Sequence, residues 1–137
     1  MPARVLYIID EDWVSRNLIE RLIKNEYGSF IVKHFDSCET AYLSIMEEQR
    51  FYTKEYPDFI LLSGMISDQC IKRFLNGVEK IQQQISKPIQ IYMMLCPETE
   101  KFQEFACSNL VKGSITKPIR PEVIFGLAES LVLQINK

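Results

Sequence analysis

Long hydrophobic stretches are missing from this sequence: no apolar run approaches the roughly 20 residues that a membrane-spanning helix needs. The amino-terminal segment, MPARVLYIIDED, has too short an apolar part for a secretory signal, and acidic residues follow that part at once. Neither acidic nor basic residues are in large excess, because the formal net charge is only −2. So small a charge gives no general attraction to nucleic acid or to an anionic membrane. We therefore expect a cytoplasmic protein whose partners include neither nucleic acid nor a membrane.

The residue types that build metal centres and redox sites are few. The four cysteines, Cys38, Cys70, Cys96 and Cys107, form no CxxC pair. Without a secretory signal, a disulfide framework has little support. We interpret the cysteines as reduced and mostly as small apolar residues of the core. The only histidine, His34, has no partner motif and is interpreted as an ordinary strand residue.

What the sequence does contain is an alternation of short apolar runs with longer stretches of helical period. At 137 residues the chain fits one domain with a sizeable core, and we expect residues 1–137 to form it without an output domain. Strands are predicted at residues 5–9, 30–35, 59–62, 88–95 and 114–116. The intervening and final helices are expected to bury, in order, Val14, Leu18 and Leu22; Ala41, Ile45 and Met46; Ile71, Phe74, Leu75, Val78, Ile81 and Ile85; Phe102, Phe105 and Ala106; and Val123, Ile124, Leu127, Leu131 and Ile135.

The order of these elements, βαβαβαβαβα, predicts an α/β protein with a doubly wound, five-stranded parallel sheet. Right-handed crossovers place helices on both faces of such a sheet, giving a three-layer sandwich. The third strand is the most apolar and is predicted to be central, and the second is predicted to be an edge. Expected helix starts are Asp12, Asp36 with Glu39 as a capping box, Asp68, and Pro121 in the first turn. Residues 49–56 are predicted to be an irregular connection.

In this architecture the carboxyl ends of four strands meet at one crevice. They bring together the pair Asp10 and Glu11, then Ser63, then residues 94–96, and then Lys117. Two adjacent carboxylates are suited to a hard cation such as Mg²⁺, and a lysine can balance their charge or bind a phosphate oxygen. The same acidic residues also suit the capping of a solvated helix start, so both interpretations stay open at this point.

Three segments give the chain a resemblance to the response-regulator receiver domain of two-component signalling. VLYIIDEDWVSRNL resembles the opening of that family, PDFILLSGMIS its third strand, and ITKPI its fifth strand with the lysine–proline step. The resemblance implies a flavodoxin-like (βα)5 fold, in which a histidine kinase phosphorylates an aspartate at the end of the third strand. It also implies that Asp10 and Glu11 match the acidic pair that holds Mg²⁺, that Lys117 matches the phosphoryl-binding lysine, and that the Lys117–Pro118 bond is cis.

The sequence departs from that family at the positions that carry its chemistry. Ser63 stands where the family has its phosphoacceptor aspartate. The hydroxyl residue expected after the fourth strand falls among residues 94–96, around Leu95, and none of these is Ser or Thr. Ser114 replaces the aromatic residue of the fifth strand. Ser67 replaces the usual proline, and Ile71 occupies a position where the family has glycine.

Losing the acceptor aspartate changes the expected site. A serine hydroxyl is neutral and needs an activating base before it can attack phosphorus. Removing one of three carboxylates should also weaken Mg²⁺ binding, so we expect either no cofactor or a weak, vestigial metal site at Asp10 and Glu11. Lys117 is then expected to pair with Asp10 or Glu11. We expect no enzymatic activity.

Three functions fit these features. The first is a degenerate receiver, a pseudo-receiver that works by protein contact with a histidine kinase, another regulator or a phosphorelay component. The resemblance implies that the fourth helix, fifth strand and fifth helix form its docking and homodimer face, with Phe102, Lys112, Arg120 and Glu122. The second function is a receiver phosphorylated at another residue, such as Asp10, Ser63 or Asp68. The third is a small-molecule or nucleotide binder, which the sequence DEDW disfavours because it forms no glycine-rich phosphate cradle.

Overall fold

The computed structural model describes residues 4–26, 30–51, 55–96, 105 and 108–135. The described strands are β1 (Arg4–Ile9), β2 (Phe30–Phe35), β3 (Phe59–Ser63), β4 (Gln90–Leu95) and β5 (Val111–Thr116). The described helices are α1 (Trp13–Glu26), α2 (Cys38–Phe51), α3 (Asp68–Gln82) and α5 (Pro121–Ile135). The strands form one parallel sheet in the order β2-β1-β3-β4-β5. The predicted central strand, edge strand and α/β class are therefore confirmed.

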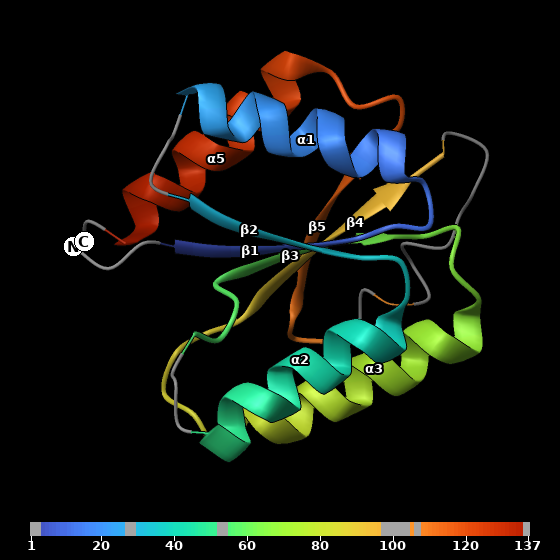
Figure 1. Cartoon of the computed structure of the whole chain (residues 1–137), viewed down its shortest axis with the longest axis vertical. Coiled ribbons are helices and arrows are strands. Elements are labelled where there is room, and N and C mark those ends of the chain that lie inside the picture. Colours follow the sequence, from blue (N-terminus) through green and yellow to red (C-terminus); the bar gives the residue numbers. More distant parts are fainter. Residues whose placement is uncertain (1–3, 27–29, 52–54, 97–104, 106–107, 136–137) are drawn as a thin grey trace.

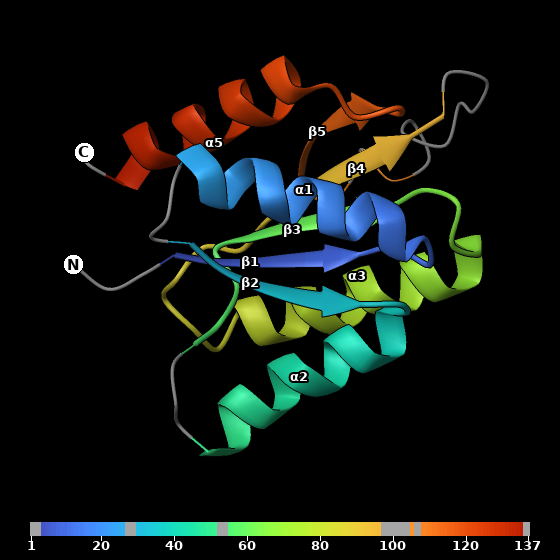
Figure 2. The same cartoon turned by 45° about the horizontal axis from the view of Figure 1, so that its top comes forward.

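The helices cover the sheet on both sides. Helices α1 and α5 lie on one face and α2 and α3 on the other, as Figures 1 and 2 show from two directions. Each face has its own core, because successive side chains of a strand point to opposite sides. In β1, Val5, Tyr7 and Ile9 join the core under α2 and α3, while Leu6 and Ile8 join the core under α1 and α5.

Three predicted inner faces need correction. In α1, Val14 and Leu18 are 57% and 43% exposed, whereas Ile19 and Ile23 are buried. The sequence holds two stripes of four-residue spacing one position apart, and spacing alone does not decide which one packs against the sheet. The stripe predicted for α3 is confirmed from Ile71 to Ile81. In α2, Ala41 and Ile45 are buried as expected, but Met46 is 40% exposed. In α5, Val123 is 38% exposed, whereas Ile124 is buried as expected.

Two of the predicted helix caps, those of α2 and α3, shift by one residue. Ser37, not Asp36, caps α2 and accepts the Thr40 N–H at 3.2 Å. Ser67 caps α3 and accepts the Cys70 N–H at 3.4 Å, so Asp68 is the first helical residue. In both places a serine next to the predicted acidic residue takes the capping position, which Ser suits as well as Asp.

Several boundaries also differ from the prediction. Helix α2 continues to Phe51, into the segment that was predicted to be irregular. Strand β5 begins at Val111, three residues before the predicted start, because Val111 and Gly113 pair with β4 despite the weak strand preference of glycine. The predicted fourth helix rests on Phe102, Phe105 and Ala106. Phe105 is helical and buried, and the other two lie outside the described residues.

The buried Tyr7 side chain makes the stability of this core sensitive to alkaline pH. Its hydroxyl and that of Ser44 form a hydrogen bond of 2.9 Å, and its ring centroid lies 4.6 Å from that of Phe35. Burial raises the pKa of Tyr7 from 10.0 to about 12. A raised pKa stabilises the fold fully below about pH 10, and this contribution is lost as pH rises through the folded pKa of about 12.

We therefore expect the wild-type protein to lose about 1.4 kcal/mol more stability than the Tyr7→Phe variant between pH 7 and about pH 11. Phenylalanine keeps the ring but cannot ionise. Urea unfolding of both proteins at the two pH values measures the difference. Equal losses in the two proteins would show that Tyr7 ionisation does not govern alkaline stability.

Candidate functional site

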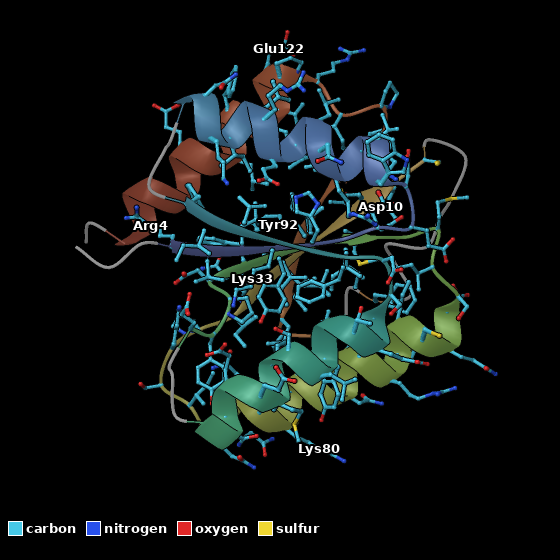
Figure 3. The ribbon with its side chains drawn as sticks, viewed as in Figure 1. Arg4, Asp10, Lys33, Lys80, Tyr92 and Glu122 are labelled. Carbon is cyan, nitrogen blue, oxygen red and sulfur yellow. The ribbon has the colours of Figure 1, made fainter. Side chains whose placement is uncertain are left out.

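The site lies at the carboxyl ends of the central strands, where two buried polar side chains stand side by side. Ile9 of β1 is in register with Leu62 of β3, so the residues that follow them, Asp10 and Ser63, are neighbours across the two strands. Asp10 is 2% exposed and Ser63 is not exposed. Among the described residues, these two are the only polar or charged side chains that are fully buried. Figure 3 shows Asp10 at the end of β1, beneath α1.

Both carboxylate oxygens of Asp10 have partners within the protein. Oδ2 accepts a hydrogen bond of 2.6 Å from the Lys117 ammonium, and the two groups form an ion pair. Oδ1 accepts the Asp12 N–H at 3.0 Å. The Arg16 guanidinium donates to the backbone carbonyl of Asp10 at 2.5 Å and so anchors the start of the loop. The predicted pairing of Lys117 with an acidic residue is confirmed for Asp10.

The Ser63 hydroxyl is used to shape its own loop. It accepts the Met65 N–H at 3.2 Å, and the Ser63 carbonyl accepts the Ile66 N–H at 3.4 Å. This is the local turn geometry that serine side chains favour just outside a regular element. The hydroxyl is therefore buried and engaged with backbone next to the ion pair of Asp10.

The end of β4 places an apolar side chain, that of Leu95, against the loop that follows Ser63. The Gly64 N–H donates to the Met94 carbonyl at 2.8 Å, which brings the loop against the end of β4. A Cβ atom added at Gly64 would lie 2.6 Å from Leu95 Cδ2, so only glycine allows this approach without a shift of the buried Leu95 side chain. Leu95 thus fills the position where a hydroxyl residue was expected. The role of Gly64 was missed in the sequence, where its only signal is a glycine directly after a buried strand.

The backbone on either side of the Lys117 Cα atom fixes where its side chain begins. Its N–H donates to the Leu95 carbonyl at 2.7 Å, and the Lys117–Pro118 peptide is cis, as the resemblance implied. Beside it, a cavity of about 440 Å³ is lined by residues of β5 and the start of α5: Ser114, Ile115, Thr116, Lys117, Pro118, Arg120 and Val123. Ser114 is exposed on β5, as are Lys112, Arg120 and Glu122 on the predicted docking face. Phe102 of that face lies outside the described residues.

The other acidic residues do not join the buried site. Glu11 is exposed. Asp12 caps α1: its carboxylate accepts the Val14 N–H at 3.0 Å and the Ser15 hydroxyl at 2.9 Å. These hydrogen bonds lower the pKa of Asp12, and the bond from the Ser15 hydroxyl has the largest effect. Of the two interpretations of the acidic run, helix capping therefore holds for Asp12, and a crevice carboxylate remains at Asp10.

The donor set does not fit a magnesium ion of the kind that the resemblance implies. Mg²⁺ requires near-octahedral oxygen coordination with one or two carboxylates. Here both oxygens of Asp10 are engaged by Lys117 and Asp12, Glu11 is exposed, and Ser63 brings no charge. Within the described part of the chain, no group of three or more His, Cys, Asp or Glu side chains is placed to hold a metal.

His34, the only histidine, lies away from this chemistry. Its Nε2 forms a hydrogen bond with the Glu20 carboxylate of α1, and Glu20 also pairs with Lys24 at 3.0 Å. The pKa of Glu20 is lowered: burial acts to raise it, and the contacts with His34 and Lys24 outweigh that effect. The contact of His34 is therefore with α1, as suits a structural residue of an edge strand.

Comparison by sequence found neither a family model nor a curated protein that matches the chain. Comparison by structure found many solved structures with a similar fold. A CheY-like response regulator receiver domain protein from Methanospirillum hungatei superposes with a TM-score of 0.70 at 15% identity, covering 98% of each chain. A two-component response regulator from Clostridium difficile gives 0.70 at 16% identity, covering 98% of this chain and 99% of the other.

The chain has the receiver-domain fold. This agrees with the resemblance read from the three sequence segments, and it places Asp10, Ser63 and Lys117 at the carboxyl ends of β1, β3 and β5. A third similar structure, NtrX from Brucella abortus in complex with ATP, has a TM-score of 0.68 at 14% identity. The match covers 96% of this chain but only 27% of NtrX. No helix among the described residues is long and apolar enough to cross a membrane.

Proposed function

We propose that this chain is a degenerate receiver module of two-component signalling that acts through protein contact, without phosphorylation of an aspartate and without catalysis. The observation that carries the proposal is the burial and hydrogen bonding of the Ser63 side chain. It occupies the acceptor position, is fully buried, and engages its hydroxyl with the Met65 N–H. Among the described residues, no carboxylate or imidazole is hydrogen-bonded to this neutral hydroxyl, so none is placed to activate it for attack on phosphorus.

The ion pair between Lys117 and Asp10 supports the same proposal. In a working receiver the lysine contacts the phosphoryl oxygens, and the acidic pair holds the metal. Here the Lys117 ammonium lies 2.6 Å from Asp10 Oδ2, so each group neutralises the other. A crevice whose charges are already balanced has little attraction for either a phosphoryl dianion or a divalent cation.

The partners proposed are other signalling proteins: a histidine kinase, a second regulator or a phosphorelay component. Neither nucleic acid nor a membrane is proposed, and such a module would act in the cytoplasm. The face of β5 and α5 is the proposed contact and homodimer surface. Its exposed Lys112, Arg120 and Glu122 support this role by offering charges of both signs to a partner.

Incubation with Mg²⁺ and acetyl phosphate, followed by intact mass measurement, tests the proposal. We expect no phosphoryl adduct under conditions in which a receiver with an intact aspartate is labelled. Peptide mapping accompanies the measurement. An adduct on Asp10, Ser63 or Asp68 would contradict the proposal and favour a receiver that is phosphorylated at a non-standard residue.

A further inference from the structure

A pocket of about 230 Å³ lies between α2 and α3, on the opposite face of the sheet from α1 and α5. Six residues line it, three from each helix: Cys38, Glu39, Tyr42, Cys70, Arg73 and Phe74. The pocket is outside the crevice of Asp10 and Ser63, and nothing in the proposed function uses it. Its distinctive feature is the presence of two thiols.

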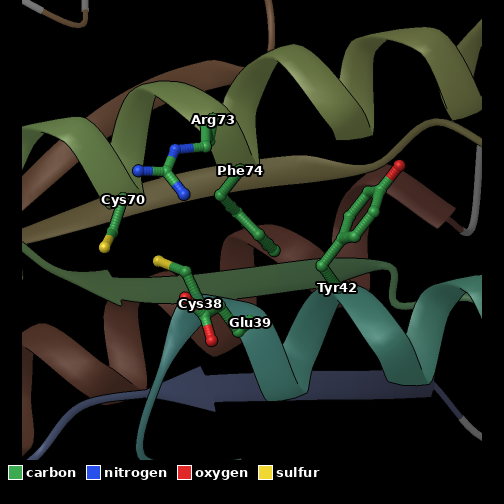
Figure 4. A pocket seen from close by; sticks show the side chains of 6 residues that line it. All are labelled: Cys38, Glu39, Tyr42, Cys70, Arg73 and Phe74. Carbon is green, nitrogen blue, oxygen red and sulfur yellow. The ribbon is translucent and has the colours of Figure 1, made fainter.

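The two thiols come from corresponding places on adjacent helices. Cys38 is the first residue of α2, and Cys70 lies in the first turn of α3. Both are free thiols. Figure 4 shows their side chains directed toward one another across the mouth of the pocket. Both helices pack on one core, and Cys38 belongs to it with Cys70 packed against it.

The two thiols differ in accessibility. Cys38 is 4% exposed, and burial raises the pKa of its thiol to about 12. Cys70 is half-buried and borders the open pocket. The Arg73 guanidinium lines the same pocket. Cys70 is therefore the thiol that a small oxidant reaches first.

We propose that Cys38 and Cys70 form a reversible disulfide that ties α2 to α3, with a low-molecular-weight disulfide such as oxidised glutathione as the oxidant. The Cys70 thiolate attacks one sulfur of the oxidant, which forms a mixed disulfide and releases one glutathione thiolate. The Cys38 sulfur, having given up its proton to solvent, then attacks Cys70 Sγ and displaces the second glutathione. The protein loses two protons and two electrons, which reduce one glutathione disulfide to two thiols.

The bond would act at a structurally sensitive place. The loop of residues 64–67 connects Ser63 to α3, and Cys70 follows it within one helical turn. A covalent link from Cys70 to α2 fixes the far end of that loop at the rim of the crevice. It also restricts the unfolded chain between residues 38 and 70, which stabilises the folded state. This inference stands independently of whether the module is phosphorylated.

A variant that retains only this pair gives a clean test. In Cys96→Ser/Cys107→Ser, oxidised glutathione is expected to remove both alkylatable thiols, with a final mass about 2 Da below that of the reduced protein and no bound glutathione. The thermal midpoint should rise and return to its starting value when dithiothreitol is added. In the matched variant that also carries Cys38→Ala, the reaction should stop at a stable mixed disulfide on Cys70.

Two results would overturn the proposal: both thiols of the two-cysteine variant remain open to alkylation, or glutathione stays bound to it. Peptide mapping of the oxidised wild-type protein provides a second readout that does not depend on any variant folding. A cross-linked peptide pair that contains residues 38 and 70 is expected there. A pair that joins Cys70 to Cys96 or Cys107 instead would count against the assignment.

Discussion

Replacing Asp10 with asparagine is expected to lower the free energy of unfolding by about 3 kcal/mol. The substitution keeps an oxygen that can accept the Asp12 N–H, but it removes the negative charge that faces Lys117. The Lys117 side chain is 16% exposed and that of Asp10 is 3% exposed, so the remaining ammonium has little water to replace its partner. A charge left alone in such a place costs several kcal/mol.

A double-mutant cycle distinguishes the ion pair from other effects of the substitution. Lys117→Met keeps the hydrocarbon stem and removes the ammonium, so it should also destabilise the protein by leaving Asp10 unpaired. The double variant Asp10→Asn/Lys117→Met buries no net charge, and we expect it to be about 2 kcal/mol more stable than the sum of the single effects implies. Urea unfolding measures all four proteins. Additive losses would show that the two groups do not depend on each other.

The fold was largely predictable from the sequence because its signals are local and repeated. Continuous apolar runs such as residues 59–62 mark strands covered on both faces, and the βα alternation allows few topologies. The errors occurred where tertiary packing decides between equal local choices. Ile19 rather than Leu18 faces the sheet, Ser37 rather than Asp36 caps α2, and pairing with β4 extends β5 back to Val111.

The sequence predicted which residues form the site, but not how each of them is exposed or packed. The rule that parallel strands present their carboxyl ends to one crevice identified Asp10, Ser63 and Lys117, and the pairing of Lys117 with an acidic residue followed from charge balance. Spacing did not reveal that Glu11 would be exposed or that Leu95 would pack over Gly64. It also did not bring Cys38 and Cys70 together, because they line one pocket only when α2 and α3 pack side by side on the same face of the sheet.

Replacing Ser63 with aspartate is expected to make the stability of the protein depend on magnesium. The new carboxylate would be buried next to Asp10, and within the described part of the chain Lys117 is the one cation paired with Asp10. Without a divalent cation, this uncompensated charge should destabilise the protein by about 2 kcal/mol. With Mg²⁺ at about ten times its dissociation constant, the variant should regain about 1.4 kcal/mol. Thermal unfolding with and without Mg²⁺ measures the effect.

Ser63→Asn is the matched control, because asparagine has nearly the shape of aspartate but no charge. It should share the steric cost of enlarging a fully buried side chain, and its stability should not respond to Mg²⁺. Stability of the wild-type protein should also be unaffected by millimolar Mg²⁺, since both oxygens of Asp10 are engaged within the protein.

The three responses together separate the possible explanations of the crevice. A Mg²⁺ response confined to Ser63→Asp would show that the crevice keeps the receiver geometry and lacks one carboxylate. A response in the wild-type protein would mean that Asp10 can release Lys117 to bind a metal, which would contradict the balanced-charge interpretation. Equal behaviour of the aspartate and asparagine variants would show that a carboxylate at position 63 does not by itself create a metal site.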